Sequence, residues 1–279
     1  MATTTFELQA VDNRVRGRLA LVTGSTGGIG SACARALAAD GCDVALHYSS
    51  SEDKAEALAK ELQDRYADQL YVTARADLSS REATRGLVSS VLSQPSVRAR
   101  HGAVSVLVAN AGVGRRIRDV GDIGEDDWDA VLEVNARSQF VVTRACVEGM
   151  RAQGWGRVVL VGSIASRGGG INGCHYAASK GAMTSMGLNL ASLLAPEGVT
   201  VNIPAMIGET GMIPTPKSRT WTSTDNLDEL RATDPGLAIA AGVPEHRLGV
   251  PDEVANVVAM FAKTGYMTGQ EVLLAGGLR

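Results

Sequence analysis

A tyrosine and a lysine stand four residues apart at Tyr176 and Lys180, and Ser163 lies thirteen positions before the tyrosine. The tyrosine phenol is a weak acid at neutral pH, because its reference pKa is about 10. A lysine ammonium at position i+4 lies on the same helix face and stabilises the phenolate, which lowers that pKa. Such a pair can give a proton to a carbonyl oxygen or take one from an alcohol. Ser163 can donate a hydrogen bond to the same substrate oxygen as negative charge develops on it.

The tyrosine–lysine pair has a second interpretation, because two exposed side chains on a helix show the same spacing. Catalysis is favoured only where the pair occurs together with other elements of a site. One of these is Asn135, which lies where one helical pattern ends and another begins. A polar side chain at such a break is a candidate for holding a water that connects the lysine to solvent.

A glycine-rich turn near the start of the chain is the second element of the site. Its small residues permit a tight turn and let the backbone approach a pyrophosphate, with helix N–H groups facing the negative charge. The spacing differs from the Gly-x-Gly-x-x-Gly fingerprint, and close packing of a strand on a helix would also explain the glycines. With Ser163, Tyr176 and Lys180 behind it, we interpret the turn as part of a nicotinamide dinucleotide site. The predicted contacts are Gly24, Ser25, Thr26, Gly28, Ile29 and Gly30.

The end of the second apolar run indicates which dinucleotide is bound. It reads His47-Tyr48-Ser49-Ser50-Ser51, with no acidic residue before Glu52. NAD sites usually place an acidic residue there, about 20 residues beyond the glycines, on the ribose 2′-hydroxyl. A carboxylate would repel a 2′-phosphate and hydroxyls do not, so NADP(H) is favoured, with Tyr48, Ser49 and Ser50 as contacts. Alternatively, the serines only cap the next helix.

Two more segments, Asp77-Leu78 and Asn110-Ala111-Gly112, follow apolar runs at the expected carboxyl ends of strands. Ligands of open α/β sheets bind at this edge, so we predict contacts there with the adenine and the nicotinamide ribose. An aspartate that opens a helix and an Asn-Ala-Gly turn are also ordinary loop residues.

The elements that position these residues alternate along the chain. Short runs rich in β-branched residues predict strands, and longer periodic patterns predict helices. The expected strands are 19–23, 43–47, 71–74, 104–109, 157–161, 199–203 and 271–274. The expected helices are 28–39, 54–66, 81–92, 127–135, 138–152, 176–194 and 252–262.

Strand runs that are apolar on both faces are typical of a parallel sheet covered by helices on both sides. Their alternation with helices predicts a single doubly wound α/β domain with seven parallel strands. We expect an N-terminal tail over residues 1–16 and one domain over 17–279. Residues 208–248 are rich in proline, serine and threonine, and a loop this long is usually functional. We predict a substrate lid, with a structural insertion or an oligomer contact as the alternative.

Composition limits the partners of the chain. It has 279 residues, a net charge of −3 and a sequence pI of about 5.9, so no general basic surface invites nucleic acid. The four cysteines, Cys33, Cys42, Cys146 and Cys174, show no metal-site spacing. So small a number of cysteines in a chain of this length favours a reducing compartment. No apolar run reaches the ~18 residues of a membrane span or resembles a signal peptide. We expect a cytoplasmic protein with no metal and no membrane partner.

Together the motifs resemble the short-chain dehydrogenase/reductase family over residues 15–278, and its 3-oxoacyl-carrier-protein reductase-like members in particular. The matches are Thr23-Gly-x-x-x-Gly-Ile-Gly30, Asp77, Asn110-Ala-Gly112, Asn135, Ser163, Tyr176-x-x-x-Lys180, Arg247-Leu-Gly-Val-Pro-Asp-Glu-Val-Ala255 and Met267-Thr-Gly-Gln270. The resemblance implies a Rossmann-type fold and a tetrad of Asn135, Ser163, Tyr176 and Lys180. Tyr176 would be the general acid/base, Ser163 would orient the substrate oxygen, and Asn135 would anchor a relay water. Lys180 would lower the tyrosine pKa and bind the nicotinamide ribose.

The resemblance also implies cofactor contacts at Ile207 and Thr210 and a homo-oligomer, commonly a tetramer, built through the two long helices around the pair. Three positions depart from the family pattern. Gly27 stands where an arginine often binds NADP, and Ala275 replaces an aspartate. After the strand 199–203, the sequence Pro204-Ala205 predicts a shortened turn in place of the usual Pro-Gly.

We therefore expect an NAD(P)-dependent oxidoreductase that reduces a ketone, 3-oxoacyl or other, to a secondary alcohol. The alternative is a dinucleotide-binding sensor or structural subunit without turnover; an epimerase or dehydratase is disfavoured because the chain has no added substrate domain. The predicted substrate pocket is largely apolar and comprises Ile164, Ala165, Cys174 and Met206. Arg115, Arg116 and Arg118 are candidates for an anionic substrate, with a solvated surface role as the alternative.

Overall fold

The computed structural model describes residues 8, 10–117, 119–168, 172–206 and 240–278. The predicted cofactor contacts Ile207 and Thr210, the candidate Arg118 and residues 208–239 of the expected lid lie outside the described residues.

Eight parallel strands form one sheet in the spatial order β3-β2-β1-β4-β5-β7-β6, with β8 paired to β7. They are β1 (Leu19–Val22), β2 (Asp43–Tyr48), β3 (Tyr71–Arg75), β4 (Val106–Ala109), β5 (Gly156–Leu160), β6 (Gly162–Ser163), β7 (Val199–Met206) and β8 (Glu271–Leu274). All the predicted strands are present, and the added β6 is a two-residue continuation beyond β5. Because β1 pairs with both β2 and β4, the strand order reverses there and forms the switch point of a doubly wound sheet.

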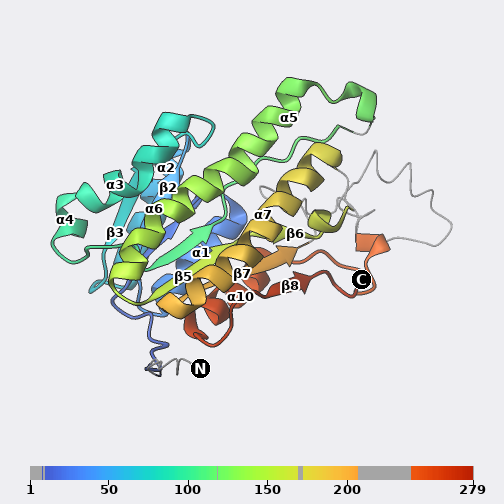
Figure 1. Ribbon diagram of the computed structural model, residues 1–279. Helices are drawn as coiled ribbons and strands as arrows, with labels where there is room; N and C mark the ends of the chain where they lie inside the picture. The colour runs from blue at the N-terminus through green and yellow to red at the C-terminus, as the bar shows by residue number, and fades with distance from the viewer. Residues whose placement is uncertain (1–7, 9, 118, 169–171, 207–239, 279) are drawn as a thin grey trace, which may run out of the picture.

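Helices connect the strands and cover both faces of the sheet (Figure 1). They are α1 (Gly28–Ala39), α2 (Glu52–Arg65), α3 (Arg81–Ser93), α4 (Pro95–Arg98), α5 (Glu125–Leu132), α6 (Ser138–Ala152), α7 (Cys174–Leu194) and α10 (Pro251–Lys263). Short helical turns are η1 (Val120–Asp122), η2 (Glu133–Arg137), η3 (Ile164–Arg167) and η4 (Ala195–Glu197). The sequence did not predict α4, η1, η3 or η4, because segments so short show too little periodicity. The predicted helix 127–135 covers the first three residues of η2.

The sheet separates two hydrophobic cores, because successive strand residues point to opposite faces. On β1, Ala20 and Val22 belong to the core that α1, α2 and α10 complete. Leu19 and Leu21 belong to the core that α3, α6 and α7 complete. This double burial is the physical reason for the continuous apolar runs in the sequence, and the predicted α/β architecture is confirmed.

The predicted break in the helix at Asn135 is wrong. The chain stays helical from α5 through η2 into α6, and η2 is a π-helical turn that contains Asn135. A π-turn inserts an extra residue into an otherwise continuous helix and changes the direction of the side chains around it. The change of periodicity in the sequence therefore marks a bulge within one long helix, not the end of a helix.

The predicted turn at Pro204 is also wrong, because β7 continues to Met206. Pro204 pairs with Val272 of β8. Proline lacks the N–H that a central strand donates, and Pro204 lies opposite a gap between two ladders. Pairing of β7 with β5 stops at Asn202, and pairing with β6 resumes at Ala205.

Asp12 and Val15 of the expected tail contact the domain. Val15 is buried, and the Asp12 carbonyl accepts hydrogen bonds from Trp155 Nε1 at 2.9 Å and Arg157 Nη2 at 3.1 Å. The Arg18 guanidinium carbon lies 3.6 Å from the Trp155 ring centroid.

Among the helices of the described ranges, none has the length and apolar character needed to span a bilayer.

Candidate active site

The predicted site residues of the described ranges lie at the carboxyl edge of the sheet, on both sides of the switch point. Gly24 follows β1, Asp77 follows β3, Asn110 follows β4 and Ser163 ends β6. Loops that leave β1 and β4 pass to opposite faces of a doubly wound sheet, which opens a crevice between them.

The glycine turn brings the end of β1 against the start of α1. Gly24 has a φ of +63°, a conformation that residues with a Cβ rarely adopt. A Cβ at Gly30 would lie 2.2 Å from the Gly24 carbonyl oxygen and 2.8 Å from Asn110 Nδ2, so no larger residue fits there. The N-cap of α1 is Gly27, which provides no side-chain cap. The first N–H groups of α1 are therefore left for a ligand, and the helix dipole favours an anionic one.

Hydrogen bonds tie the glycine turn to the end of β4. Asn110 Nδ2 donates to the carbonyl oxygens of Thr23 at 2.9 Å and Gly24 at 3.2 Å. In return, Thr23 Oγ1 accepts from the backbone N–H groups of Asn110 and Ala111, both at 2.9 Å. Asn110 Oδ1 is buried and has no hydrogen-bond partner among the described residues, which leaves one acceptor for a ligand.

A cavity of about 420 Å³ lies over this turn. Of the predicted cofactor contacts, its lining includes Gly24, Thr26, Ser49, Ser50, Asp77, Leu78, Asn110, Ala111 and Gly112. It also includes residues that we did not predict, namely Gly27, His47, Ser51, Ser79, Val113 and Val134. His47 and Ser51 directly flank predicted contacts in the sequence, so their position at the strand end was a usable signal.

Several predicted contacts lie beside this cavity and do not line it. Tyr48 is buried, and its hydroxyl donates to Glu52 at 2.8 Å. Ser25 is buried, and its hydroxyl donates to the His47 carbonyl oxygen at 3.1 Å. Gly28, Ile29 and Gly30 form the first turn of α1, where their contribution is backbone N–H groups and the absence of bulk at Gly30.

The residues of the cavity fit a dinucleotide. The glycine turn and the open N-terminus of α1 suit a pyrophosphate, and the hydroxyls of Ser49 and Ser50 stand at the end of β2 without an adjacent carboxylate in the lining. Asp77 is the acidic residue of this lining. Hydrogen bonds from the Ser79 N–H and hydroxyl lower the pKa of Asp77, so its carboxylate is ionised and can accept from an adenosine.

Asn135 joins the helix α5–η2–α6 to the loop after β4 and to α7. Its Oδ1 accepts from Val113 N at 2.8 Å, and its Nδ2 donates to Val113 O at 2.9 Å and Ser179 Oγ at 3.1 Å. Ser179 Oγ donates in turn to the Tyr176 carbonyl oxygen at 2.7 Å. A Cβ at Gly112 would lie 3.1 Å from Asn135 Oδ1, so this glycine permits the close approach of the loop.

Tyr176 and Lys180 lie on α7 and are both buried. Lys180 Nζ donates to the Val161 carbonyl oxygen at 2.9 Å and lies 5.9 Å from the Tyr176 ring centroid. The carbonyl of Val161 is available because the β4–β5 ladder ends at Ala109 and Leu160. Burial lowers the pKa of Lys180 to about 8, yet its ammonium form stabilises a neighbouring phenolate at neutral pH.

Ser163 lies close to the pair through the turn that follows it. Ser163 Oγ accepts from Ala165 N at 3.2 Å, and Ala165 packs with Tyr176 and Val131 in one buried cluster. Accepting that bond leaves the hydroxyl hydrogen of Ser163 able to donate to a substrate oxygen. The structure thus brings Asn135, Ser163, Tyr176 and Lys180 to one place at the sheet edge.

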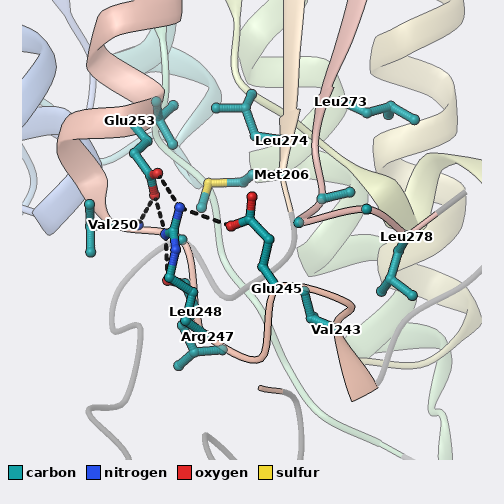
Figure 2. A pocket seen from close by; sticks show the side chains of 15 residues that line it. Met206, Val243, Glu245, Arg247, Leu248, Val250, Glu253, Leu273, Leu274 and Leu278 are labelled. Atoms are coloured by element: carbon teal, nitrogen blue, oxygen red, sulfur yellow. Dashed lines mark hydrogen bonds and ion pairs between the residues drawn. The ribbon is translucent and has the colours of Figure 1, made fainter. Parts of the chain in front are cut away.

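The predicted substrate-pocket residues lie in three different elements, η3, α7 and β7. Ile164 and Ala165 lie in η3, and Cys174 is exposed at the start of α7. Met206 lines a separate cavity of about 510 Å³ between the ends of β7 and β8 and the N-terminus of α10. Figure 2 shows Arg247 at the edge of this cavity, paired with Glu253 and Glu245.

Two other sequence features have structural roles here. Arg115 forms an ion pair with Asp127, so this arginine is engaged by the protein. The Glu253 carboxylate accepts a hydrogen bond from Val250 N at 2.9 Å, and this bond caps α10. The same carboxylate accepts from the Arg247 guanidinium. The bond from Arg247 lowers the pKa of Glu253 to about 2.

Among the residues that the structure describes, no cluster of His, Cys, Asp and Glu could hold a metal ion.

Known proteins are similar to this chain in sequence and in fold. The family model described as short chain dehydrogenase matches residues 18–225. An acetoacetyl-CoA reductase of Allochromatium vinosum is 33% identical over 266 residues, covering 94% of this chain and 98% of the relative. A 3-oxoacyl-(acyl-carrier-protein) reductase of Escherichia coli K12 is 33% identical over 269 residues, covering 94% and 97%. A solved gluconate 5-dehydrogenase from Burkholderia cenocepacia J2315, in complex with NADP and tartrate, has a TM-score of 0.77 and 28% identity, covering 95% of this chain and 96% of that chain.

The burial of Lys180 predicts a pH-dependent contribution to stability. Its pKa of about 8 in the folded protein lies below the ordinary value of 10.5. Between these values the unfolded chain binds more protons, so the free energy of unfolding of the wild type rises with pH. Lys180→Met removes this titration. In urea unfolding without cofactor, we expect the difference, wild type minus variant, to rise by on the order of 2 kcal/mol from about pH 7 to about pH 10.

Lys54→Met is the matched control, because Lys54 is exposed on α2. Its difference from the wild type should stay constant over the same range. A constant or falling difference for Lys180→Met would contradict a buried, proton-releasing lysine.

Proposed function

Since this chain belongs to the short-chain dehydrogenase/reductase family, we propose that it uses NADPH to reduce a ketone to a secondary alcohol. As a family member it is an oxidoreductase that acts on CH–OH or C=O groups with NAD(P). The observation that supports the finer proposal is the buried Lys180, whose Nζ lies 5.9 Å from the ring centroid of the buried Tyr176. A positive charge within about 4–6 Å of an ionisable group favours its anionic form, so Lys180 is placed to stabilise the phenolate of Tyr176.

A bound nicotinamide would supply the hydride, and side chains of the protein would transfer the proton. Tyr176 gives its phenolic proton to the carbonyl oxygen, since the ammonium of Lys180 lowers the free energy of the phenolate that remains. Ser163 donates a hydrogen bond to the same oxygen as charge develops there. Asn135 positions the loop after β4 and, through Ser179, the backbone of Tyr176.

A 3-oxoacyl thioester is the substrate class that we propose. Two relatives with about a third of their residues identical are named for the reduction of acetoacetyl-CoA and of a 3-oxoacyl carrier protein. The residues after Ser163, Ile164 and Ala165, are apolar and suit an acyl chain. Arg115 is paired with Asp127, which makes a direct contact with an anionic substrate a poorer explanation of that arginine.

Replacement of Tyr176 tests the catalytic proposal. With acetoacetyl-CoA and NADPH, Tyr176→Phe should reduce kcat by about 10²–10⁴, because a general acid is lost. The Kd for NADPH, measured by fluorescence titration, should stay close to that of the wild type. The rate is followed by the loss of reduced-nicotinamide absorbance, with the exposed Tyr266→Phe as the matched control.

Two results would contradict this proposal. If Tyr176→Phe keeps the wild-type rate, another group is the acid. If the wild type binds NADPH but shows no turnover with a panel of ketones and alcohols, the sensor or structural-subunit alternative is correct.

The preference for NADPH over NADH is proposed on the hydroxyls at the end of β2. Ser49→Asp places a carboxylate at the position from which it would repel a 2′-phosphate. The ratio of NADPH affinity to NADH affinity should fall by about tenfold or more, equivalent to ~1.4 kcal/mol. Ser89→Asp, on the exposed side of α3, makes the same charge change far from the cavity and should leave the ratio unchanged. An unchanged ratio in Ser49→Asp would contradict the assignment of the site.

A homo-oligomer is proposed through α6 and α7, where large apolar side chains remain exposed. Phe140 on α6 and Leu188 and Leu193 on α7 are 42%, 40% and 59% exposed, and exposed apolar patches mark interaction surfaces. Light scattering should give a mass of two or more chains, and a monomer would contradict the proposal.

A cytoplasmic location is proposed on the four free cysteines, and recovery of the protein from an extracytoplasmic cell fraction would contradict it.

A further inference from the structure

His47 connects three segments of the cofactor cavity. It lies in β2, lines the cavity and is only 2% exposed. Its ring nitrogen Nδ1 accepts from Gly24 N at 3.0 Å, and Nε2 lies 3.0 Å from the Ala76 carbonyl oxygen. Its backbone carbonyl accepts from Ser25 N at 2.9 Å and Ser25 Oγ at 3.1 Å.

The two ring contacts determine the protonation of His47. A backbone N–H only donates, so Nδ1 must present a lone pair to Gly24, and a carbonyl only accepts, so Nε2 must carry the hydrogen for Ala76. The ring is therefore neutral and in a single tautomer. Burial lowers the pKa of His47 to about 4, in agreement with this assignment.

The hydrogen bond from Gly24 N to His47 lies just beyond the carboxyl end of the β1–β2 ladder. The β1–β2 ladder stops at Val22 and Leu46, and beyond it the His47 ring and carbonyl hold the Gly24–Ser25 backbone in place of strand pairing. The Gly24 carbonyl lies against the start of α1, since a Cβ at Gly30 would be 2.2 Å from it. Gly24 is therefore packed directly against the first turn of α1.

We propose that His47 is a positioning residue for the dinucleotide, which aims the N–H groups of the glycine turn and of the α1 N-terminus at the pyrophosphate. This inference rests on the proposed use of the cavity by NADP(H). His47 itself does not contact the phosphates; it acts through Gly24. A glycine at φ +63° has no side chain to hold it, so an external acceptor limits its freedom.

Three substitutions separate the two ring contacts. His47→Asn keeps an acceptor near the position of Nδ1 and loses the donor to Ala76. His47→Gln extends its amide toward Ala76 and loses the acceptor at the δ position. His47→Leu loses both. The measurement is the Kd for NADPH by isothermal titration, together with urea unfolding of each variant without cofactor.

The expected order of affinity is wild type, then His47→Asn, then His47→Gln and His47→Leu. Loss of the buried bond to Gly24 should raise the Kd by about tenfold, and kinetics with acetoacetyl-CoA should show a raised KM for NADPH with little change in kcat. His101→Leu is the matched control. His101 Nε2 lies 2.7 Å from Asp43 Oδ2, beside the amino end of the sheet, so this variant loses stability without a change in the Kd.

Equal NADPH affinity in His47→Gln and His47→Asn, or wild-type affinity in His47→Leu, would overturn the inference. So would a loss of affinity in His101→Leu as large as that in His47→Gln, because the effect would then follow stability alone. If His47→Leu does not fold, the Asn and Gln variants decide the outcome. Failure of the wild type to bind NADPH would instead overturn the proposed function.

Discussion

The reversal of strand order at β1 is the constraint on which the rest of the structure depends. β1 pairs with β2 on one side and with β4 on the other, so the connections that leave β1 and β4 diverge and open a crevice at the carboxyl edge. A crevice at a sheet edge exposes backbone groups that have no ladder partner. Here side chains replace the ladder: Thr23 and Asn110 bond the two strand ends to each other, and His47 holds Gly24.

A buried charge imposes the second constraint. Transfer of an ammonium out of water is unfavourable unless a partner compensates for the lost hydration, and Lys180 is 1% exposed. The Val161 carbonyl supplies that partner at 2.9 Å, immediately before the residues that carry Ser163. The compensation is incomplete, because the pKa of Lys180 remains lowered to about 8. The same burial that disfavours the ammonium removes the water that would screen its effect on Tyr176.

The sequence predicted the elements well where local pattern and tertiary packing agree. Helix α1 has the predicted bounds, and α6 ends at the predicted Ala152, since each is amphipathic. The predictions failed at Asn135 and Pro204, where a local rule was overridden. A π-turn keeps the helix continuous through Asn135, and the gap between β5 and β6 accommodates a proline within β7. Pairing with β5, β6 and β8, which lie far from β7 in the sequence, decided where β7 ends.

The sequence by itself determined the fold class, the family and the order of the chemical groups, because periodicity, glycine spacing and the Tyr176–Lys180 pair are local properties. Only the tertiary structure decided which atoms those groups meet. Tyr48 was expected in the cavity with the serines that follow it, but its hydroxyl bonds to Glu52, while its neighbour His47 lines the cavity. Successive residues of a strand point to opposite faces, and which face meets the crevice depends on β1, β3 and the glycine turn. No local pattern contains that information.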